Sequence, residues 1–140
     1  MKLDIAQKIV AGAFAAGRSA NMKPLSVAVL DDRGALKLVA SEDGTSLKRA
    51  EIAIGKAHGS LAMGLGSRTL FTRAQQQPYF IAAVPHSVGP LIPVPGGVLI
   101  LDAAKSVIGA IGVSGDTSDN DEIAALAGIG AAGLTGDPGT

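Results

Sequence analysis

The spacing of hydrophobic residues changes along the first half of the chain and predicts distinct segments. Between Leu3 and Ala20, apolar side chains recur every four residues in two adjacent rows, which is the stripe of an amphipathic helix. Residues 25–40, LSVAVLDDRGALKLVA, then form two apolar runs around Asp32-Arg33-Gly34. Gly34 permits the positive φ that a short turn needs, so this stretch predicts a β-hairpin.

Helical spacing returns in the central segment, which begins near Thr45 or Ser46. Apolar residues fall there at alternating steps of three and four: Leu47, Ala50, Ile54, Ala57 and Leu61. This period predicts a second helix over 46–64 with one buried face.

Prolines and glycines divide the second half. Residues 67–94 hold four of the seven prolines and predict one short helix followed by a loop. Residues 97–102 and 106–113 predict a second hairpin. The last helix begins near Asp119, with one apolar side made of Ile123, Leu126 and Ile129. We expect the tail, 134–140, to be frayed.

These elements follow the order α-β-β-α-β-β-α. Each strand pair is joined by a hairpin rather than a crossover, which predicts an α+β fold: an antiparallel sheet with flanking helices. At 140 residues, the chain has the common size of one domain, so we expect a single domain over 1–140.

Composition narrows the classes of partner. Lys plus Arg balance Asp plus Glu at 12 each, which argues against nucleic acid. No apolar run reaches the length of a membrane span, and Asp4 and Lys8 argue against a secretory signal, so we expect a cytoplasmic protein. Hydrophobic residues make up 47% of so short a chain, which predicts apolar surface that a homo-oligomer would cover.

The stretch VIGAIGVSGDTSDNDE, 107–122, combines glycines with acidic residues. Its GxxGxxG spacing matches neither the dinucleotide fingerprint nor the Walker loop, and its acids do not fit a calcium-binding EF-hand. Ser118 and Asp121 instead fit a capping box at the start of a helix. Gly109 and Gly112 lie within a strand, where bare backbone indicates the close approach of a helix or a ligand.

This stretch also carries a family resemblance. GAIGVSG followed by DTSDNDEIAALAGI, preceded by PVPGGVLILDAAKSVIG and by IAIGKAHGSLAMG, resembles the GlcG/HbpS-like, haem-degrading family. The resemblance implies a five-stranded antiparallel sheet with flanking helices and assembly into homo-oligomers. It also implies a small-molecule ligand, with haem as the candidate cofactor, because some members bind haem and others sit in operons of catabolic pathways. By position, Lys56-Ala57 and Gly96-Gly97 match family motifs, whereas His58 departs from them.

The central helix carries the candidate catalytic residues Glu51, Lys56 and His58. Histidine exchanges protons near neutral pH, and a carboxylate or an amine can complement it, as in isomerases, tautomerases and lyases. Gly55 leaves a notch beside His58, in which either a substrate or a packing partner could lie.

Candidate ligand-binding residues gather between this helix and the loop from Ser67 to Pro95, where we expect a site at a subunit boundary. They are Arg68, His86, Gly96, Gly97 and Gly112. Arg49, Arg68 and Arg73 could each hold a carboxylate in bidentate fashion. Two histidines cannot build a three-histidine zinc site within one chain, whereas a site of histidine and carboxylates stays open, and no metal ligand is predicted. Two hypotheses follow: a small-molecule binder of the haem type, or a cofactor-free enzyme that transfers protons on a small carboxylated metabolite.

Overall fold

A computed structural model describes all 140 residues, Met1 to Thr140. Its helices and strands follow the chain in the order α1 (Leu3–Ser19), β1 (Ser26–Asp31), β2 (Leu36–Ser41), α2 (Arg49–Met63), α3 (Ser67–Gln76), α4 (Pro78–Ala83), α5 (Pro85–Val88), β3 (Gly97–Leu101), β4 (Val107–Ser114), α6 (Ser118–Ala131) and β5 (Thr135–Asp137). No helix of the structure is both long enough and apolar enough to cross a membrane.

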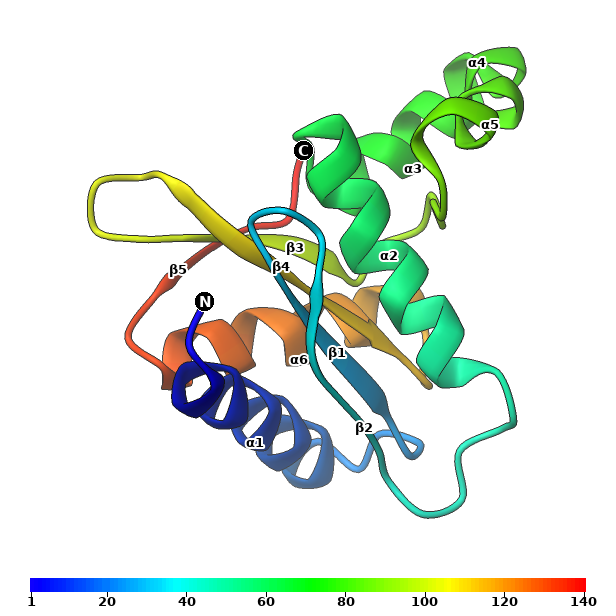
Figure 1. Cartoon of the computed structure of the whole chain (residues 1–140). Helices are drawn as coiled ribbons and strands as arrows, with labels where there is room; N and C mark the ends of the chain where they lie inside the picture. Colours follow the sequence, from blue (N-terminus) through cyan, green and yellow to red (C-terminus); the bar gives the residue numbers. More distant parts are fainter.

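The five strands form one sheet in the order β2-β1-β4-β3-β5, and every neighbouring pair is antiparallel. Helix α2 covers one face, whereas α1 and α6 lie side by side on the other (Figure 1). The predicted α+β fold with a five-stranded antiparallel sheet and flanking helices is therefore confirmed. Both predicted hairpins are present, and Gly34 has the expected positive φ of 84°.

The two faces of the sheet are packed differently. Between the sheet and α1 with α6 lies the larger core, built from branched side chains such as Ile9, Val29 and Ile111. Beneath α2 the core is smaller and rich in alanine. A Cβ atom added at Gly112 of β4 would overlap the Ala53 carbonyl oxygen of α2. Glycine and alanine at this face thus let the helix backbone approach the sheet closely, which gives Gly112 its packing role.

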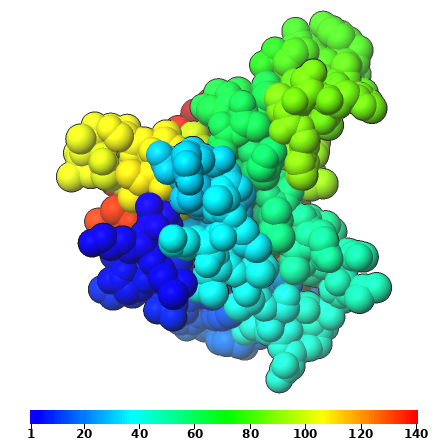
Figure 2. All heavy atoms as spheres, in the orientation of Figure 1, coloured from blue at the N-terminus to red at the C-terminus, as the bar shows by residue number.

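Helices α3, α4 and α5 form a separate projection, which we call the arm (Ser67–Val88). It stands out beyond α2 in both overall views (Figures 1 and 2). Its apolar contacts centre on Leu70, Ile81 and Leu91, apart from the two cores at the sheet. The prediction of one short helix followed by a loop was wrong here, because two of the prolines open helices: Pro78 and Pro85 lie at the first helical positions of α4 and α5.

Three further expectations differ from the structure. The tail is not frayed, because β5 pairs with β3 from Leu101↔Thr135 to Leu99↔Asp137. Helix α2 begins at Arg49, so Leu47 lies outside it and is 88% exposed. In α6, Ile123 is 55% exposed, because the inward face is formed by Ala124, Ala125, Gly128 and Ile129.

The N-terminus of α6 is capped by a different residue from the one that the sequence predicts. Thr117, not Ser118, is the N-cap, and its side chain accepts a hydrogen bond from the backbone N–H of Asn120 at 3.2 Å. The predicted capping box is therefore wrong. The Asp121 side chain is instead buried, and it forms an ion pair with Lys56.

Candidate functional site

Lys56 and Asp121 form a buried ion pair that connects α2 with α6. Both side chains are 2% exposed, and the Lys56 Nζ lies 2.9 Å from Asp121 Oδ2 and 2.8 Å from the Val113 carbonyl oxygen. Burial lowers the pKa of Lys56 and raises that of Asp121, and in each case the opposite charge counteracts the shift. No sequence signal separates this role of Asp121 from the capping role that its position also fits.

Gly96 and Gly97 lie at the start of β3. Gly96 contacts the Lys56 side chain, and Gly97 contacts the Lys56 backbone. A Cβ at Gly96 would lie 2.9 Å from the Lys56 Nζ, and one at Gly97 would lie 2.8 Å from Ser60 Oγ. With Gly112 under Ala53, all three predicted ligand-binding glycines are covered by α2 or its side chains. The monomer gives them a packing role, and a ligand role stays a prediction.

The notch at Gly55 is filled by the chain that follows the arm. Ile92 packs over it, and the Ile92 N–H donates to the Gly55 carbonyl oxygen at 3.2 Å. Glu51 lies one turn earlier on α2, where its carboxylate is 60% exposed and 3.5 Å from Lys48 Nζ. The notch therefore holds a packing partner, and Glu51 faces solvent.

His58 is held at the surface between two turns. Its Nδ1 lies 2.7 Å from the Pro90 carbonyl oxygen, which can only accept, so Nδ1 carries the proton. Nε2 is then free to accept a proton or bind a metal. It lies beside Gly34 and Gly89, where added Cβ atoms would come within 3.9 and 4.0 Å. An added Cβ at either turn would thus be in ordinary van der Waals contact with this nitrogen.

Arg68 is engaged by two carboxylates of α6. Its Nε donates to both oxygens of Glu122 at 3.1 and 3.0 Å, and its Nη2 lies 2.6 Å from Asp119 Oδ1. The hydrogen bond that Arg68 donates to Asp119 is the main cause that raises the pKa of Arg68. His86 lies on α5 of the arm and is exposed. Lys56, His58 and Arg68 thus have separate partners, and no cavity of the monomer joins them.

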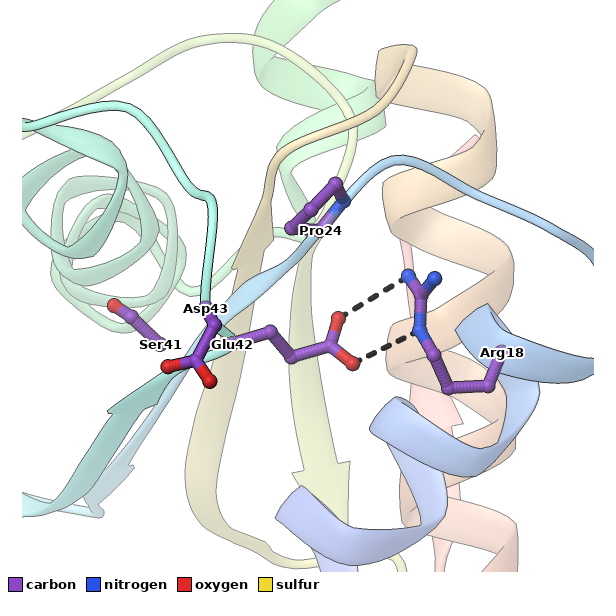
Figure 3. Close-up of a pocket in the computed structure, with 5 residues that line it drawn as sticks. All are labelled: Arg18, Pro24, Ser41, Glu42 and Asp43. Atoms are coloured by element: carbon purple, nitrogen blue, oxygen red, sulfur yellow. Dashed lines mark hydrogen bonds and ion pairs between the residues drawn. The ribbon is translucent and has the colours of Figure 1, made fainter.

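Two cavities lie away from His58, towards the N-terminal end of α2. The larger, about 460 Å³, is an open hollow lined by Arg18, Pro24, Ser41, Glu42 and Asp43 (Figure 3). Arg18 forms a bidentate ion pair with Glu42 there, with Nε 2.9 Å from Oε2 and Nη2 3.2 Å from Oε1. The second, about 200 Å³, shares Pro24 and extends to Arg49 and Gly115. Both are lined by polar or small residues, so neither is an apolar pocket.

Comparison with protein families identifies the chain. The family described as haem degrading protein HbpS-like matches residues 1–130. The protein therefore belongs to the HbpS-like family, and the resemblance seen in the sequence is confirmed. A search of curated proteins found no match.

Solved structures share the fold over nearly the whole chain. The Klebsiella pneumoniae protein ORFY is 23% identical, covers 95% of this chain and 90% of its own, and has a TM-score of 0.84. A PduOC–heme complex is 20% identical, with coverage of 96% of both chains and a TM-score of 0.84. HbpS is 26% identical, covers 93% of this chain and 88% of its own, and has a TM-score of 0.79.

His58 offers a nitrogen donor that suits haem iron, but the chain forms no cavity around this residue. An imidazole whose Nδ1–H is held by a carbonyl presents Nε2 in the tautomer that binds iron. Ile54 and Leu61 lie one turn to either side on α2, and both are half-buried. Neither cavity of the monomer includes His58. These residues fit a haem bound at the surface, not one enclosed by a single chain.

Proposed function

We propose that the protein binds a small molecule at His58, and that haem is the ligand this site fits best. The observation that carries the proposal is the hydrogen bond between His58 Nδ1 and the Pro90 carbonyl oxygen, which leaves Nε2 available and fixes the ring. Membership of the HbpS-like family and the similarity in fold to a PduOC–heme complex support it. In a haem complex, His58 would hold the iron through Nε2.

The open position of His58 leads to a second part of the proposal, that a homo-oligomer completes the site. Four large apolar side chains remain exposed on β2, at the start of β4 and in the loop before α2: Leu36, Val39, Val107 and Leu47. A second copy that covers this surface and extends to His58 would exclude water from a bound porphyrin. Light scattering should then give a mass above the 13.9 kDa of one chain, and a monomer at all working concentrations would contradict this part.

The geometry favours binding over proton transfer. An isomerase, tautomerase or lyase built from Glu51, Lys56 and His58 would need all three to reach one substrate. Lys56 is buried and bonded to Asp121 and to the Val113 carbonyl oxygen. Glu51 is exposed to solvent beside Lys48. The small carboxylated substrate of that alternative would therefore meet His58 alone. We also infer a role in a catabolic pathway from the resemblance, and a cytoplasmic location from the sequence. Assays of candidate pathway intermediates would test the pathway.

A hemin titration tests the proposed ligand. Wild-type protein should develop a Soret band at stoichiometric hemin, and His58→Ala should lose it. His86→Ala is the matched control, because His86 is exposed on the arm and lies outside the site at His58. No Soret band in the wild type would refute haem binding. Loss of the band in His86→Ala but not in His58→Ala would refute the assignment of the ligand residue.

A further inference from the structure

The smaller cavity lies at the N-terminal end of α2, away from His58. Arg49 and His58 are nine positions apart on this helix, which separates them by about 14 Å at 1.5 Å of rise per residue. The cavity has a volume of about 200 Å³ and is lined by the link between α1 and β1, the loop before α2, and Gly115. It is therefore a different place from the proposed haem site.

Arg49 brings a half-buried guanidinium to this cavity without a carboxylate partner. Its Nε donates to Ser46 Oγ and its Nη1 to Ser114 Oγ, each at 3.2 Å. These two hydroxyls fix the plane of the guanidinium and leave donors on Nη1 and Nη2 unused. Arg18 and Arg68, by contrast, each hold carboxylates.

The remaining charges around the cavity reinforce this difference. Lys23 adds a second cation that forms no ion pair, and no acidic residue lines the cavity. The nearby carboxylate of Asp116 is already occupied by the Lys23 N–H at 2.7 Å, the Thr117 N–H at 2.8 Å and the Asn120 side chain at 2.7 Å. Neither cation of this cavity forms an ion pair, although the nearby Asp116 carboxylate keeps its charge and interacts electrostatically with Lys23.

We propose that this cavity binds the carboxylate group of a small organic anion. The unused Nη1 and Nη2 donors of Arg49 take the carboxylate oxygens, while Lys23 and Thr45 complete the lining. The planar fork of Arg49 matches the two oxygens of a carboxylate in bidentate fashion. The same fork can also pair with phosphate, so the experiment compares the two anions. Since a water molecule takes about 30 Å³, the cavity holds an anion of roughly six non-hydrogen atoms. This inference does not depend on haem binding.

Acetate is the probe, because it carries the proposed group and little else. In ¹H–¹⁵N spectra at constant ionic strength, acetate should cause saturable shifts of the Arg49 side-chain Nε–H and the Gly115 amide. Chloride should not, and phosphate should bind more weakly. Absence of saturable shifts with acetate would overturn the proposal, and tighter binding of phosphate would overturn the carboxylate assignment.

Variants identify the residues that hold the anion. Arg49→Gln should weaken acetate binding at least about tenfold, the scale of a lost hydrogen bond to a charged group. Arg49→Lys should recover only part of it, because it restores the charge without the fork. Arg33→Gln is the matched control, since Arg33 is exposed in the β1–β2 turn. Should Arg49→Gln fail to fold, Lys23→Gln still tests the site and should weaken binding several-fold. Wild-type affinity in a folded Arg49→Gln, or in Lys23→Gln, would overturn the assignment.

Discussion

Removing the Lys56 amine should destabilise the protein more than any change at its exposed lysines. Lys56→Met keeps the length and the apolar stem of the side chain but leaves Asp121 without its counter-ion and the Val113 carbonyl without its donor. Breaking a pair this deeply buried costs about 3–5 kcal/mol of unfolding free energy. With about 2.1 cal/mol/K of unfolding entropy per residue, the midpoint of thermal unfolding should fall by about 10–17 °C.

A double-mutant cycle measured by urea unfolding separates the pair from the rest of the site. Lys56→Met and Asp121→Leu should each be costly, and the double variant should lose less than their sum by about 1–3 kcal/mol. Recovery will be partial, because the Asp116 N–H also donates to Asp121 Oδ1 at 3.0 Å. Lys48→Met is the control, since the Lys48–Glu51 pair is exposed and should contribute less than about 1 kcal/mol. Additive single effects, or equal losses at Lys48 and Lys56, would refute the reasoning.

Three other predictions concern glycines and acid. Gly112→Ala should cost about 3 kcal/mol or more, because its Cβ would overlap the Ala53 carbonyl oxygen beneath α2. Gly130→Ala should instead stabilise by about 0.5–1 kcal/mol, since this helical glycine has open space around its Cβ position. Hydrogen bonds, chiefly from the Lys23 N–H, lower the pKa of Asp116 from 3.8 to about 2, so its contribution to stability is present above pH 3.8 and is lost as the pH falls towards 2. Asp116→Asn should remove this part of the acid sensitivity in denaturation curves measured across that range.

The two glycine variants control for each other, because they make the same chemical change in different surroundings. Equal effects on urea midpoints would show that α2 does not press on β4 as the structure describes. For Asp116→Asn, an acid-unfolding profile parallel to that of the wild type would contradict the depressed pKa.

Local patterns predicted the parts of the fold that depend on neighbours in sequence. The hairpin at Gly34 and the stripe of the first helix need only a few adjacent residues, and both were correct. The helices of the arm differ from the prediction because prolines usually indicate loops, whereas Pro78 and Pro85 begin helices here. Strand β5 was missed because TGD has no hydrophobic alternation, and its place depends on pairing with β3.

The candidate site illustrates a similar limit. His58 was singled out from its chemistry, but its partner, the Pro90 carbonyl, lies 32 residues away and has no side-chain signature. Arg49 was one of three arginines considered for a carboxylate. Only the fold shows that Arg68 is occupied by Glu122 and Asp119, while Arg49 has hydroxyl partners alone.

The small separate core of the arm has a consequence for motion. Its apolar contacts centre on Leu70, Ile81 and Leu91, and α4 packs against α3 and α5 rather than against a strand. We therefore expect α4 and α5 to open without disrupting the sheet, while α3 stays bonded to β3 and α6. Amide hydrogens of α4 and α5 should then exchange with solvent far faster than those of the central strands. Because Pro90 directly follows the arm, we expect each such opening to weaken the hydrogen bond that holds the His58 ring. The lifetime of that bond should then follow the local opening of the arm rather than global unfolding.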